Sequence, residues 1–296
     1  MVVALVSAAN SRALDDDLPP LSAALDALGV ETEVVDWDDP NTDWSGFELA
    51  IVRSTWDYPD RRDEFLAWAE RVETATTLLN PSAVLRWNTD KRYLADLARH
   101  GVPVVPTTFY APGDAVDIAA EDATVVKPAV SAGARDAARY AAGDRDGVRS
   151  HVAGLNAAGR VAMVQPYMPG IDEAGESGLV FVDGVLSHGL FKGPILSSAV
   201  EMVDGVYALE TLAARDPTEA QHTVGTAALT ATDAVLGRDA QPPLLYARVD
   251  LVPGSEGTPL VLELELTEPS LFHAYAPGSA ARFAAAIAAR VQNTHS

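Results

Sequence analysis

The chain has no cysteine and no long apolar run. The absence of cysteine from its 296 residues excludes disulfides, thiolate zinc sites and a cysteine nucleophile. No apolar stretch approaches the length that spans a bilayer, and the N-terminal MVVALVSAANSRALDDD has neither a basic region nor a signal-like cleavage site. Because a chain without disulfides suits the cytosol, we expect a cytoplasmic protein.

Basic residues are also scarce. The chain has 21 Lys and Arg against 42 Asp and Glu, a formal net charge of −21. Nucleic acids and anionic membranes bind through cationic surfaces, so we expect neither as a partner. An anionic small molecule would need a local cluster of Lys and Arg, because overall charge describes solubility better than it describes a site.

Several common nucleotide-binding and catalytic signatures are missing. The sequence contains no G-x-x-x-x-G-K-[ST], no G-x-G-x-x-G, no G-x-S-x-G and no H-E-x-x-H. The first turn between strand and helix is the acidic segment SAANSRALDDD, which is unfavourable for a pyrophosphate. A nicotinamide-dependent oxidoreductase is therefore not expected.

The first part of the chain alternates strands with helices. Short apolar runs predict strands, and apolar residues at helical spacing predict the helices between them. This alternation indicates an open, largely parallel sheet with helices on its faces. The predicted strands are 2–7, 30–37, 47–54 and 77–84, and the predicted helices are 19–29, 60–73 and one that begins at an N-cap on Asn88 or Thr89 and ends at Gly101.

From residue 123 the pattern changes to β-strands and Gly-rich turns. The turn at 182–185, Val-Asp-Gly-Val, is typical of a hairpin. Residues 193–217 are poorly periodic and form a candidate loop or lid. Two further helices are expected, at 218–236 and 278–291.

Two strands near the C-terminus carry carboxylates where buried strands carry apolar residues. They are RVDLV at 248–252 and the start of ELELTEP at 263–269. Side chains i and i+2 of a strand share a face, so Glu263 and Glu265 project together. Neighbouring buried carboxylates repel unless a divalent cation lies between them, and Mg²⁺ prefers oxygen ligands. Asp250, Glu263 and Glu265 are therefore candidate metal ligands, the alternative being an antiparallel strand with one solvated acidic face.

Two lysines precede this strand pair. Lys91 lies in NTDK at the expected start of a helix, and Lys127 ends a strand before the small-residue segment SAGAR. In such a loop backbone N–H groups can converge on an anion. Lysines, a small-residue loop and a carboxylate metal site are the parts that phosphoryl transfer needs. Each part alone is better explained by a solvated lysine or an ordinary turn, and only their order supports a site.

In this order the elements resemble the ATP-grasp superfamily, and within it the glutathione-synthetase-like branch. The resemblance runs through most of the chain from about residue 47. It implies an α/β fold of three lobes, in which an open parallel-sheet N-terminal domain supplies substrate contacts and two α+β lobes clasp ATP. The expected units are a substrate domain at 1–86, a small central ATP-grasp lobe at 87–175 and a C-terminal lobe with the metal site at 176–296. The matching segments are IVRSTWDYPDRRDEFL, TLLNPSAVLRWNTDK, VVKPAVSAGAR, QPYMPGIDEAGESGLVFVDG, RVDLV and ELELTEP.

The same resemblance implies roles for individual residues. Asp250 and Glu263 would bind Mg²⁺, with Glu265 standing where the family often has Asn. The segment SAGAR would cover the phosphates, although the family usually has more glycine there. The remaining implied residues are Lys91 and Lys127 for the phosphates, Gln165, Pro166, Tyr167 and Met168 as the hinge that reads adenine, and Glu176 for the ribose, with Asp172 and Glu173 as alternatives.

The stretch RSTWDYPDRRDEF is most similar to the cyclo-ligases of D-cycloserine biosynthesis. This resemblance implies that ATP phosphorylates the carboxylate of O-ureido-D-serine, after which a nitrogen of the same molecule closes the ring with loss of carbon dioxide and ammonia. Arg53, at a strand end, would bind a substrate carboxylate. Arg248 would stabilise the transferring phosphoryl group, a structural ion pair being its alternative role. Trp56, Asp57 and Tyr58 could line the substrate pocket, although for Trp56 a place in the core is the stronger expectation, because large aromatic side chains usually pack there.

Other polar residues are weaker candidates. Lys192 and Arg215 flank the irregular segment 193–217, and one of them could close over the phosphates. The six histidines show no ligand spacing. His188 and His273 lie near proposed site segments, but the sequence assigns them no role.

We therefore predict a cytoplasmic ligase that uses ATP and Mg²⁺ and acts through an acyl phosphate on a small amino-acid-like substrate. An intermolecular carboxylate–amine ligase is the alternative that the motifs do not separate from a cyclo-ligase. A non-catalytic nucleotide-binding sensor is disfavoured because the lysines and carboxylates are all retained. Related ligases often bury a first-domain helix against its twin, so the resemblance also implies a homodimer.

Overall fold

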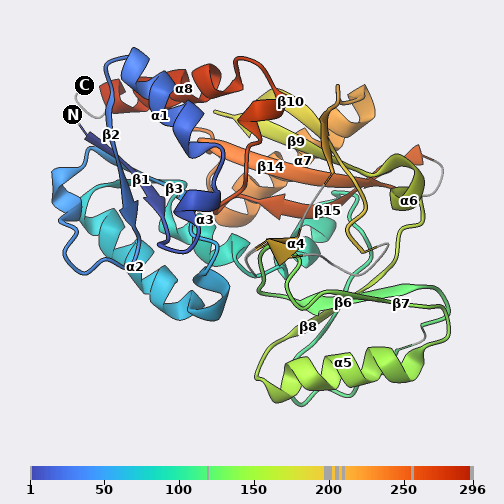
Figure 1. Cartoon of the computed structure of the whole chain (residues 1–296). Coiled ribbons are helices and arrows are strands. Elements are labelled where there is room, and N and C mark those ends of the chain that lie inside the picture. Colours follow the sequence, from blue (N-terminus) through green and yellow to red (C-terminus); the bar gives the residue numbers. More distant parts are fainter. Residues whose placement is uncertain are drawn as a thin grey trace.

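A parallel sheet formed by the first part of the chain lies at one side of the molecule (Figure 1). The computed structural model describes residues 2–118, 120–196, 202–203, 207–208, 211–254 and 257–293. The sheet has the order β2-β1-β3-β4, and all its pairings are parallel, as the strand–helix alternation predicts. Its elements are β1 (Val2–Ser7), α1 (Leu18–Ala27), β2 (Glu31–Asp36), β3 (Leu49–Ser54), α2 (Arg62–Ala75) and β4 (Thr77–Leu79), with 3-10 turns at Arg12–Leu14, Trp44–Gly46 and Tyr58–Asp60.

The end of this unit differs from the prediction of a strand at 77–84. The strand β4 stops at Leu79, and α3 (Ser82–Asn88) begins directly after Pro81. Proline fixes its own φ in a range that suits the start of a helix. The apolar residues Val84 and Leu85 are therefore buried by a helix and not by a longer strand.

The helix expected to begin at Asn88 or Thr89 is also displaced. Asn88 is the last residue of α3, and α4 (Tyr93–Arg99) has Arg92 at its N-cap. Lys91 consequently lies in the turn between two helices. The predicted stop is confirmed, because Gly101 adopts a φ of +80° just beyond α4.

A small antiparallel sheet with one covering helix forms the lower lobe of Figure 1. Its strand order is β5-β8-β6-β7. The sequence analysis did not predict its helix α5 (Arg145–Ala157), although Asp144 accepts a hydrogen bond from the N–H of Gly147 and Val148, Val152 and Leu155 are buried at helical spacing. The strands are β5 (Thr108–Tyr110), β6 (Thr124–Pro128), β7 (Ala138–Tyr140) and β8 (Ala162–Pro166).

The third sheet is antiparallel, with the order β13-β10-β9-β14-β15. The hairpin between β9 and β10 is confirmed, with Asp183 and Gly184 at φ of +51° and +77°. The predicted helix at 218–236 is α7, and Thr218 and Gln221 form a capping box at its start. The elements are α6 (Gly170–Ala174), β9 (Glu176–Val182), β10 (Val185–Lys192), β13 (Leu212–Ala214), α7 (Glu219–Leu236), β14 (Tyr246–Pro253), β15 (Pro259–Glu265), a 3-10 turn at His273–Tyr275 and α8 (Ser279–Asn293), beside a short pair β11 (Met202–Val203) and β12 (Tyr207–Ala208).

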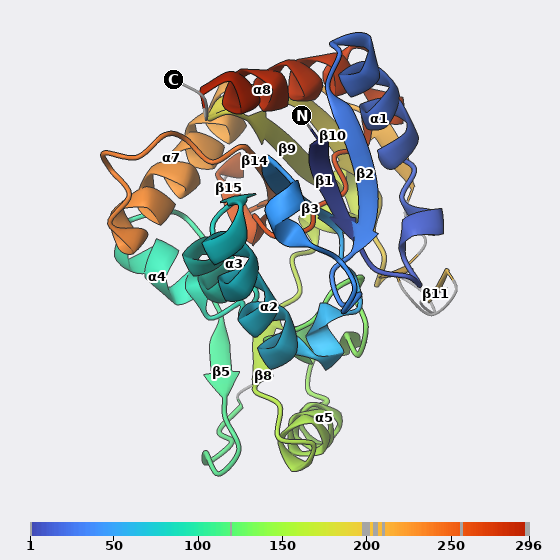
Figure 2. The same ribbon diagram turned by 90° about the vertical axis from the view of Figure 1, so that its left-hand side faces the viewer.

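One hydrophobic core joins the two ends of the chain. Leu5 of β1 and Leu25 of α1 share a buried cluster with Val180 of β9 and with Phe283 and Ile287 of α8. Figures 1 and 2 show α8 lying beside α1. Each sheet falls within one of the expected ranges 1–86, 87–175 and 176–296, but α8 packs on the first unit and α4 on α7 of the third. The domain boundaries themselves stay a prediction.

Part of the expected lid lies outside the described residues. Of the segment 193–217, residues 197–201, 204–206 and 209–210 are not described. Within the described part of the chain, no helix combines the length and the apolar character needed to cross a bilayer.

Ile287→Ala tests whether α8 belongs to the cooperative core of the first unit. Ile287 is fully buried, so truncation should lower the free energy of unfolding by about 2–5 kcal/mol. Urea unfolding followed by far-UV circular dichroism measures the change. The control Leu28→Ala, at a side chain that is 52% exposed, should cost less than about 0.5 kcal/mol. Equal midpoints for the two variants would contradict the shared core.

Candidate active site

A cavity of about 450 Å³ opens where the three sheets meet. Its wall takes Asp15 from the first unit, Lys127 from the small lobe and Glu263 from the third sheet. A volume of this size suits a small-molecule ligand. Most residues that the sequence singles out also lie on this wall: Trp56, Tyr58, Lys91, Gln165, Pro166, Tyr167, Met168, Glu176, Arg248 and Glu265.

The register of β14 and β15 places the predicted metal ligands on one face. Arg248 pairs with Glu265, and Asp250 pairs with Glu263 across the two antiparallel strands. Directly opposed residues project to the same side of a sheet. The structure therefore brings the three carboxylates and Arg248 together, with Asp250 only 2% exposed.

Side chains from the preceding helices hold the edge strand β15 in place. The Asn88 amide donates to the Leu264 carbonyl at 2.7 Å and accepts from the Leu266 N–H at 2.7 Å. The Tyr93 hydroxyl accepts from the Leu264 N–H at 2.9 Å. An edge strand otherwise leaves such groups unpaired. These bonds fix the backbone on both sides of Glu263 and Glu265.

Two predicted phosphate ligands lie on either side of Glu263. Its carboxylate is 2.9 Å from the Lys91 ammonium and 4.0 Å from that of Lys127. Burial raises the pKa of Glu263, but the two lysines outweigh it and leave the pKa below its ordinary value. Burial lowers the pKa of the Lys127 ammonium, and Glu263 offsets only part of that effect. Lys91 also donates to the Ser131 carbonyl at 2.7 Å.

Asp250 lies between two buried cations. Arg248 donates to both of its carboxylate oxygens, at 2.9 and 3.0 Å, and Lys192 donates at 2.9 Å. Burial alone would raise the pKa of Asp250, but Arg248 and Lys192 hold it well below its usual range. Arg248 further donates to Glu265 and to the Ser270 carbonyl. The ion pairs expected as an alternative role for Arg248 are therefore present.

Lys192 is a site residue that the sequence reasoning placed only beside a lid. It ends β10 opposite Glu176, whose carboxylate lies 3.6 Å from the lysine nitrogen. Counting outward from the turn at 182–185 would pair Glu176 with Phe191. A register shift between Leu186 and His188 moves the pairing by one residue. The hairpin pattern predicts that residues near 191 lie opposite Glu176, but it does not predict the bulge that brings Lys192 to that position.

Two acids on the wall, Glu265 and Glu268, have raised pKa values. Burial, together with the charges of Glu263 and Asp250, raises the pKa of Glu265 to about 7 despite Arg248. Burial and the charge of Glu265 raise the pKa of Glu268 to about 8, and Tyr58 is hydrogen-bonded to that carboxyl. The sequence analysis did not single out Glu268, although it stands in the same ELELTEP segment.

The donor set fits a hard divalent cation. Asp250, Glu263 and Glu265 offer only carboxylate oxygens, and Glu265 is short of compensating positive charge, as its raised pKa indicates. Across the described ranges, no group of three or more His, Asp or Glu side chains is already spaced as a metal cluster. Cations of the chain take up these oxygens instead.

The expected adenine hinge, residues 165–168, is part of the cavity wall. Gln165 is buried and donates to the Thr107 hydroxyl at 2.9 Å, and the Tyr167 N–H donates to the Ala123 carbonyl at 2.7 Å. Of the three acids considered for the ribose, only Glu176 is on the cavity wall. The Asp172 carboxylate accepts from the Tyr167 hydroxyl and lies 3.5 Å from Arg139.

The structure does not bring Arg53 to the cavity wall. It is 1% exposed, donates to the Pro269 carbonyl at 2.8 Å and lies against the rings of Tyr246 and Phe283. The strand end is covered by the returning C-terminal segment, which the local sequence could not indicate. Its expected contact with a substrate carboxylate stays a prediction that these contacts do not favour.

Asp57 is also directed away from the cavity. Its carboxylate accepts from the Trp37 indole at 2.9 Å and from Arg61 at 2.7 Å. Trp56 and Tyr58 do line the wall. Trp56 and Tyr58 therefore face the cavity, whereas Asp57 between them faces the structural contacts with Trp37 and Arg61.

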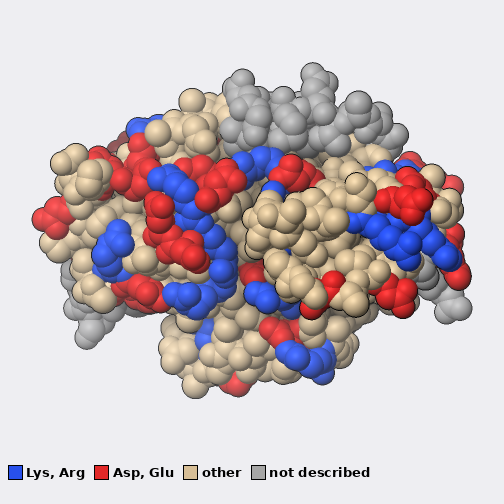
Figure 3. All heavy atoms as spheres, turned by 90° about the horizontal axis from the view of Figure 1, so that it is seen from below, with Lys and Arg blue, Asp and Glu red and all other residues tan. Residues whose placement is uncertain are grey.

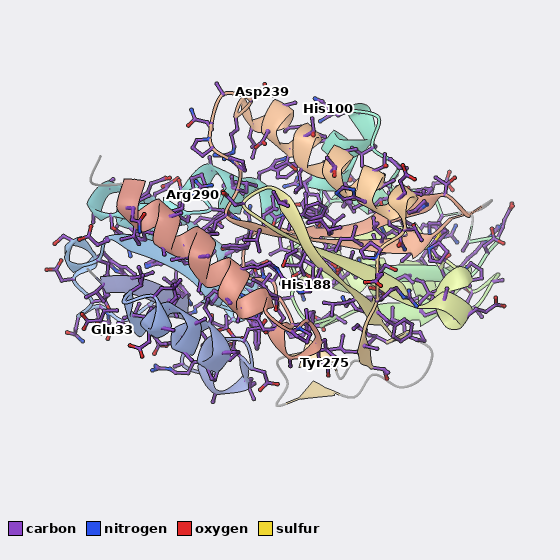
Figure 4. The ribbon with its side chains drawn as sticks, turned by 90° about the horizontal axis from the view of Figure 1, so that it is seen from above. Glu33, His100, His188, Asp239, Tyr275 and Arg290 are labelled. Carbon is purple, nitrogen blue, oxygen red and sulfur yellow. The ribbon has the colours of Figure 1, made fainter. Side chains whose placement is uncertain are left out.

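Two histidines, His188 and His273, make structural hydrogen bonds near the site. Figure 4 shows His188 near the middle of the molecule and His100 at its periphery. His188 contacts the Leu271 carbonyl at 2.7 Å, and His273 contacts the Ser279 hydroxyl at 2.9 Å. The backbone N–H groups of Leu271, Phe272 and His273 all donate to the Asp17 carboxylate. This segment is thereby tied to the first unit.

Comparison with solved structures defines the class. A D-alanine–D-alanine ligase from Bacillus anthracis complexed with ATP superposes with a TM-score of 0.69 at 16% identity, covering 99% of this chain and 98% of that one. The ATP-grasp ligase PsnB superposes with a TM-score of 0.62 at 19% identity, covering 98% and 99%. The fold is that of the ATP-grasp ligases, so the predicted α/β ATP-grasp fold is confirmed.

Closer relatives define the family. A family model described as D-cycloserine synthetase DcsG, N-terminal domain, matches residues 3–80. The cycloserine biosynthesis protein DcsG of Streptomyces lavendulae is 44% identical over 98% of this chain and 99% of its own. A crystal structure of D-cycloserine synthetase DcsG superposes with a TM-score of 0.89, covering 98% and 100%. The chain belongs to the D-cycloserine synthetase DcsG family.

The buried His273 should make stability depend on pH. Burial lowers its pKa to about 4 from 6.5, with Asp17 opposing and Arg53, His188 and Arg282 reinforcing the shift. The unfolded chain therefore binds this proton more readily, so its contribution to the free energy of unfolding is lost as pH falls from about 6.5 towards 4.

His273→Gln should remove up to about 3 kcal/mol of that pH dependence. Urea unfolding of both proteins at about pH 7, 5.5 and 4.5 measures the difference. Parallel pH profiles for the wild type and the variant would contradict the depressed pKa.

Proposed function

We propose that this ligase cyclises O-ureido-D-serine to D-cycloserine. ATP transfers its γ-phosphoryl group to the substrate carboxylate, giving ADP and an acyl phosphate. The ureido nitrogen bonded to oxygen attacks the acyl carbon and releases phosphate as the ring closes. Water then removes the carbamoyl group as carbon dioxide and ammonia.

The observation that carries this proposal is the 44% identity with D-cycloserine synthetase DcsG across nearly the whole of both chains. The cavity supports it independently, because buried lysine and arginine side chains are gathered there in a chain of net charge −21. Such a cluster is what an anionic substrate needs in an acidic protein.

The phosphates would be held by three lysines and one loop. Lys91, Lys127 and Lys192 converge from three different elements on the carboxylates of β14 and β15. The loop at 131–137, which includes Gly133 and Ala134 with left-handed φ of +64° and +59°, covers the same side of the cavity. Small residues in such conformations let backbone N–H groups face an anion.

Different residues of the cavity wall would hold the nucleoside and the metal ion. The hinge at 165–168 would contact adenine and Glu176 the ribose. Asp250, Glu263 and Glu265 would hold Mg²⁺, which supplies positive charge to the phosphate oxygens. Arg248, which is fixed by two carboxylates and a carbonyl, would donate to the transferred phosphoryl group.

Ring closure needs little beyond this. An acyl phosphate is a good leaving group, and a nucleophile in the same molecule reacts at high effective concentration when both ends are held in one small cavity. Trp56 and Tyr58 on the wall would exclude water from the acyl phosphate.

The setting of the reaction is part of the proposal. We propose a cytoplasmic homodimer that acts on small molecules and not on nucleic acid. The absence of cysteine supports the cytoplasmic location, and the net charge of −21 supports the exclusion of nucleic acid. The homodimer rests only on the resemblance to related ligases. Figure 3 shows Lys and Arg side chains interleaved with Asp and Glu on the face seen from below. Light scattering after size-exclusion chromatography measures the oligomeric state.

Product analysis tests the reaction directly. The purified protein with MgATP and O-ureido-D-serine alone should release ADP and D-cycloserine together, because the nucleophile belongs to the substrate itself. ADP release that requires an added amine would show an intermolecular ligase. Magnesium-dependent ATP binding without turnover on any added substrate would favour a nucleotide-binding protein.

Glu263→Gln tests the proposed metal ligands. The change keeps the size of the side chain but removes the charge that lies between Lys91 and Lys127, so kcat should fall by about 100-fold or more. Far-UV circular dichroism should remain unchanged. The exposed Glu31→Gln is a matched control and should retain full activity. A fully active Glu263→Gln enzyme would contradict the metal assignment.

A further inference from the structure

The loop at 131–137, here called the small-residue loop, is held near both ends by Lys91 and Arg160. At its start, Lys91 donates to the Ser131 carbonyl at 2.7 Å. Near its end, Arg160 of the small lobe donates to the Asp136 carboxylate at 2.6 Å. These contacts hold the base of the loop, but they do not connect it to the first unit.

The substrate loop, residues 56–60, faces it from the first unit. Its Trp56 and Tyr58 line the cavity, and the Trp56 indole donates to the Glu268 carbonyl at 3.2 Å. The loop is therefore in contact with the segment that carries the acidic residues of β15. The position of this loop therefore affects the shape of the cavity that Trp56 and Tyr58 line.

Arg135 connects the two loops. Its guanidinium donates to the Asp60 carboxylate at 2.9 Å and to the Trp56 carbonyl at 3.5 Å. The side chain is 24% exposed, and its Nε is buried. An arginine side chain laid across a boundary between two units fixes their relative position through a planar set of donors.

We propose that Arg135 is a positioning residue that fastens the small-residue loop to the substrate loop. The loop then covers the transferring phosphoryl group only when the substrate loop is in its productive position. This inference rests on the proposed function in one respect, namely that the phosphates lie beneath the small-residue loop. Its consequence is that phosphoryl transfer is coupled to a bound substrate and is withheld from water.

The ion pair between Arg135 and Asp60 should matter for the alignment of the small-residue loop and contribute little to the stability of the fold. Asp60 is 69% exposed, and ion pairs with an exposed partner contribute little to folding. A small misplacement of a covering loop, by contrast, lowers the rate strongly and admits water to a reactive intermediate. The variants should therefore fold normally and differ in coupling.

Arg135→Ala and Asp60→Asn test the proposal, with Arg160→Ala as the matched control. Arg160 donates to the same loop from within the small lobe, so its loss removes a similar contact without touching the substrate loop. Both test variants should lower kcat for D-cycloserine by about tenfold and raise the ratio of ADP to D-cycloserine several-fold above 1. The KM for ATP should change less than kcat, and the double variant should be no worse than either single one.

Hydrogen–deuterium exchange gives a second readout that needs no turnover. With Mg²⁺ and a non-hydrolysable ATP analogue, exchange at residues 131–137 should be faster in Arg135→Ala than in the wild type and in Arg160→Ala. Unchanged coupling in Arg135→Ala, or exchange equal to that of Arg160→Ala, would overturn the inference. If the wild type does not cyclise O-ureido-D-serine, the proposed function is wrong. The hydrogen–deuterium exchange measurement then tests the role of Arg135 by itself.

Discussion

The mutual compensation of buried charges is the constraint on which the site depends. Asp250, Glu263 and Glu265 lie on one face of two strands. Asp250 is almost excluded from water, and the Glu263 and Glu265 side chains are partly buried, at 24% and 27% exposed. A buried carboxylate without a partner is strongly unfavourable. The fold therefore has to bring cations to this face from other elements, and it does so with Lys91 from a helix–helix turn and Lys192 from a strand end. The cavity is where these elements meet.

On the proposed function, the same compensation allows an exchange of partners. Lysines that hold Glu263 and Asp250 in the structure would transfer to the phosphates when a nucleotide binds with its cation. The lysines would then pair with the phosphates, and the carboxylates with the cation. Nucleotide binding would therefore leave no buried charge without a partner. The raised pKa of Glu265 and Glu268 marks the side of the cavity where positive charge is still lacking.

The parts of the site that the sequence predicts are those defined by local rules. Strand alternation places Glu263 and Glu265 on one face, and the small residues after Lys127 indicate a loop. Lys192 depends on a bulge in its hairpin, and the surroundings of Arg53 depend on a segment that returns from the other end of the chain. Such contacts between distant segments leave no local pattern. The missed helix α5 is different, because its cap and apolar spacing were readable and were outweighed by the neighbouring strands.

The contact of α8 with α1 affects how the protein can be made. As the ribosome releases β1 and α1, the apolar surface that Phe283 and Ile287 later cover has no partner yet. Domains generally fold as units during synthesis, the N-terminal one first, but this first unit is completed only by a helix translated more than 250 residues after β1. The apolar surface of the nascent sheet therefore stays exposed, or bound to a chaperone, until α8 has been synthesised.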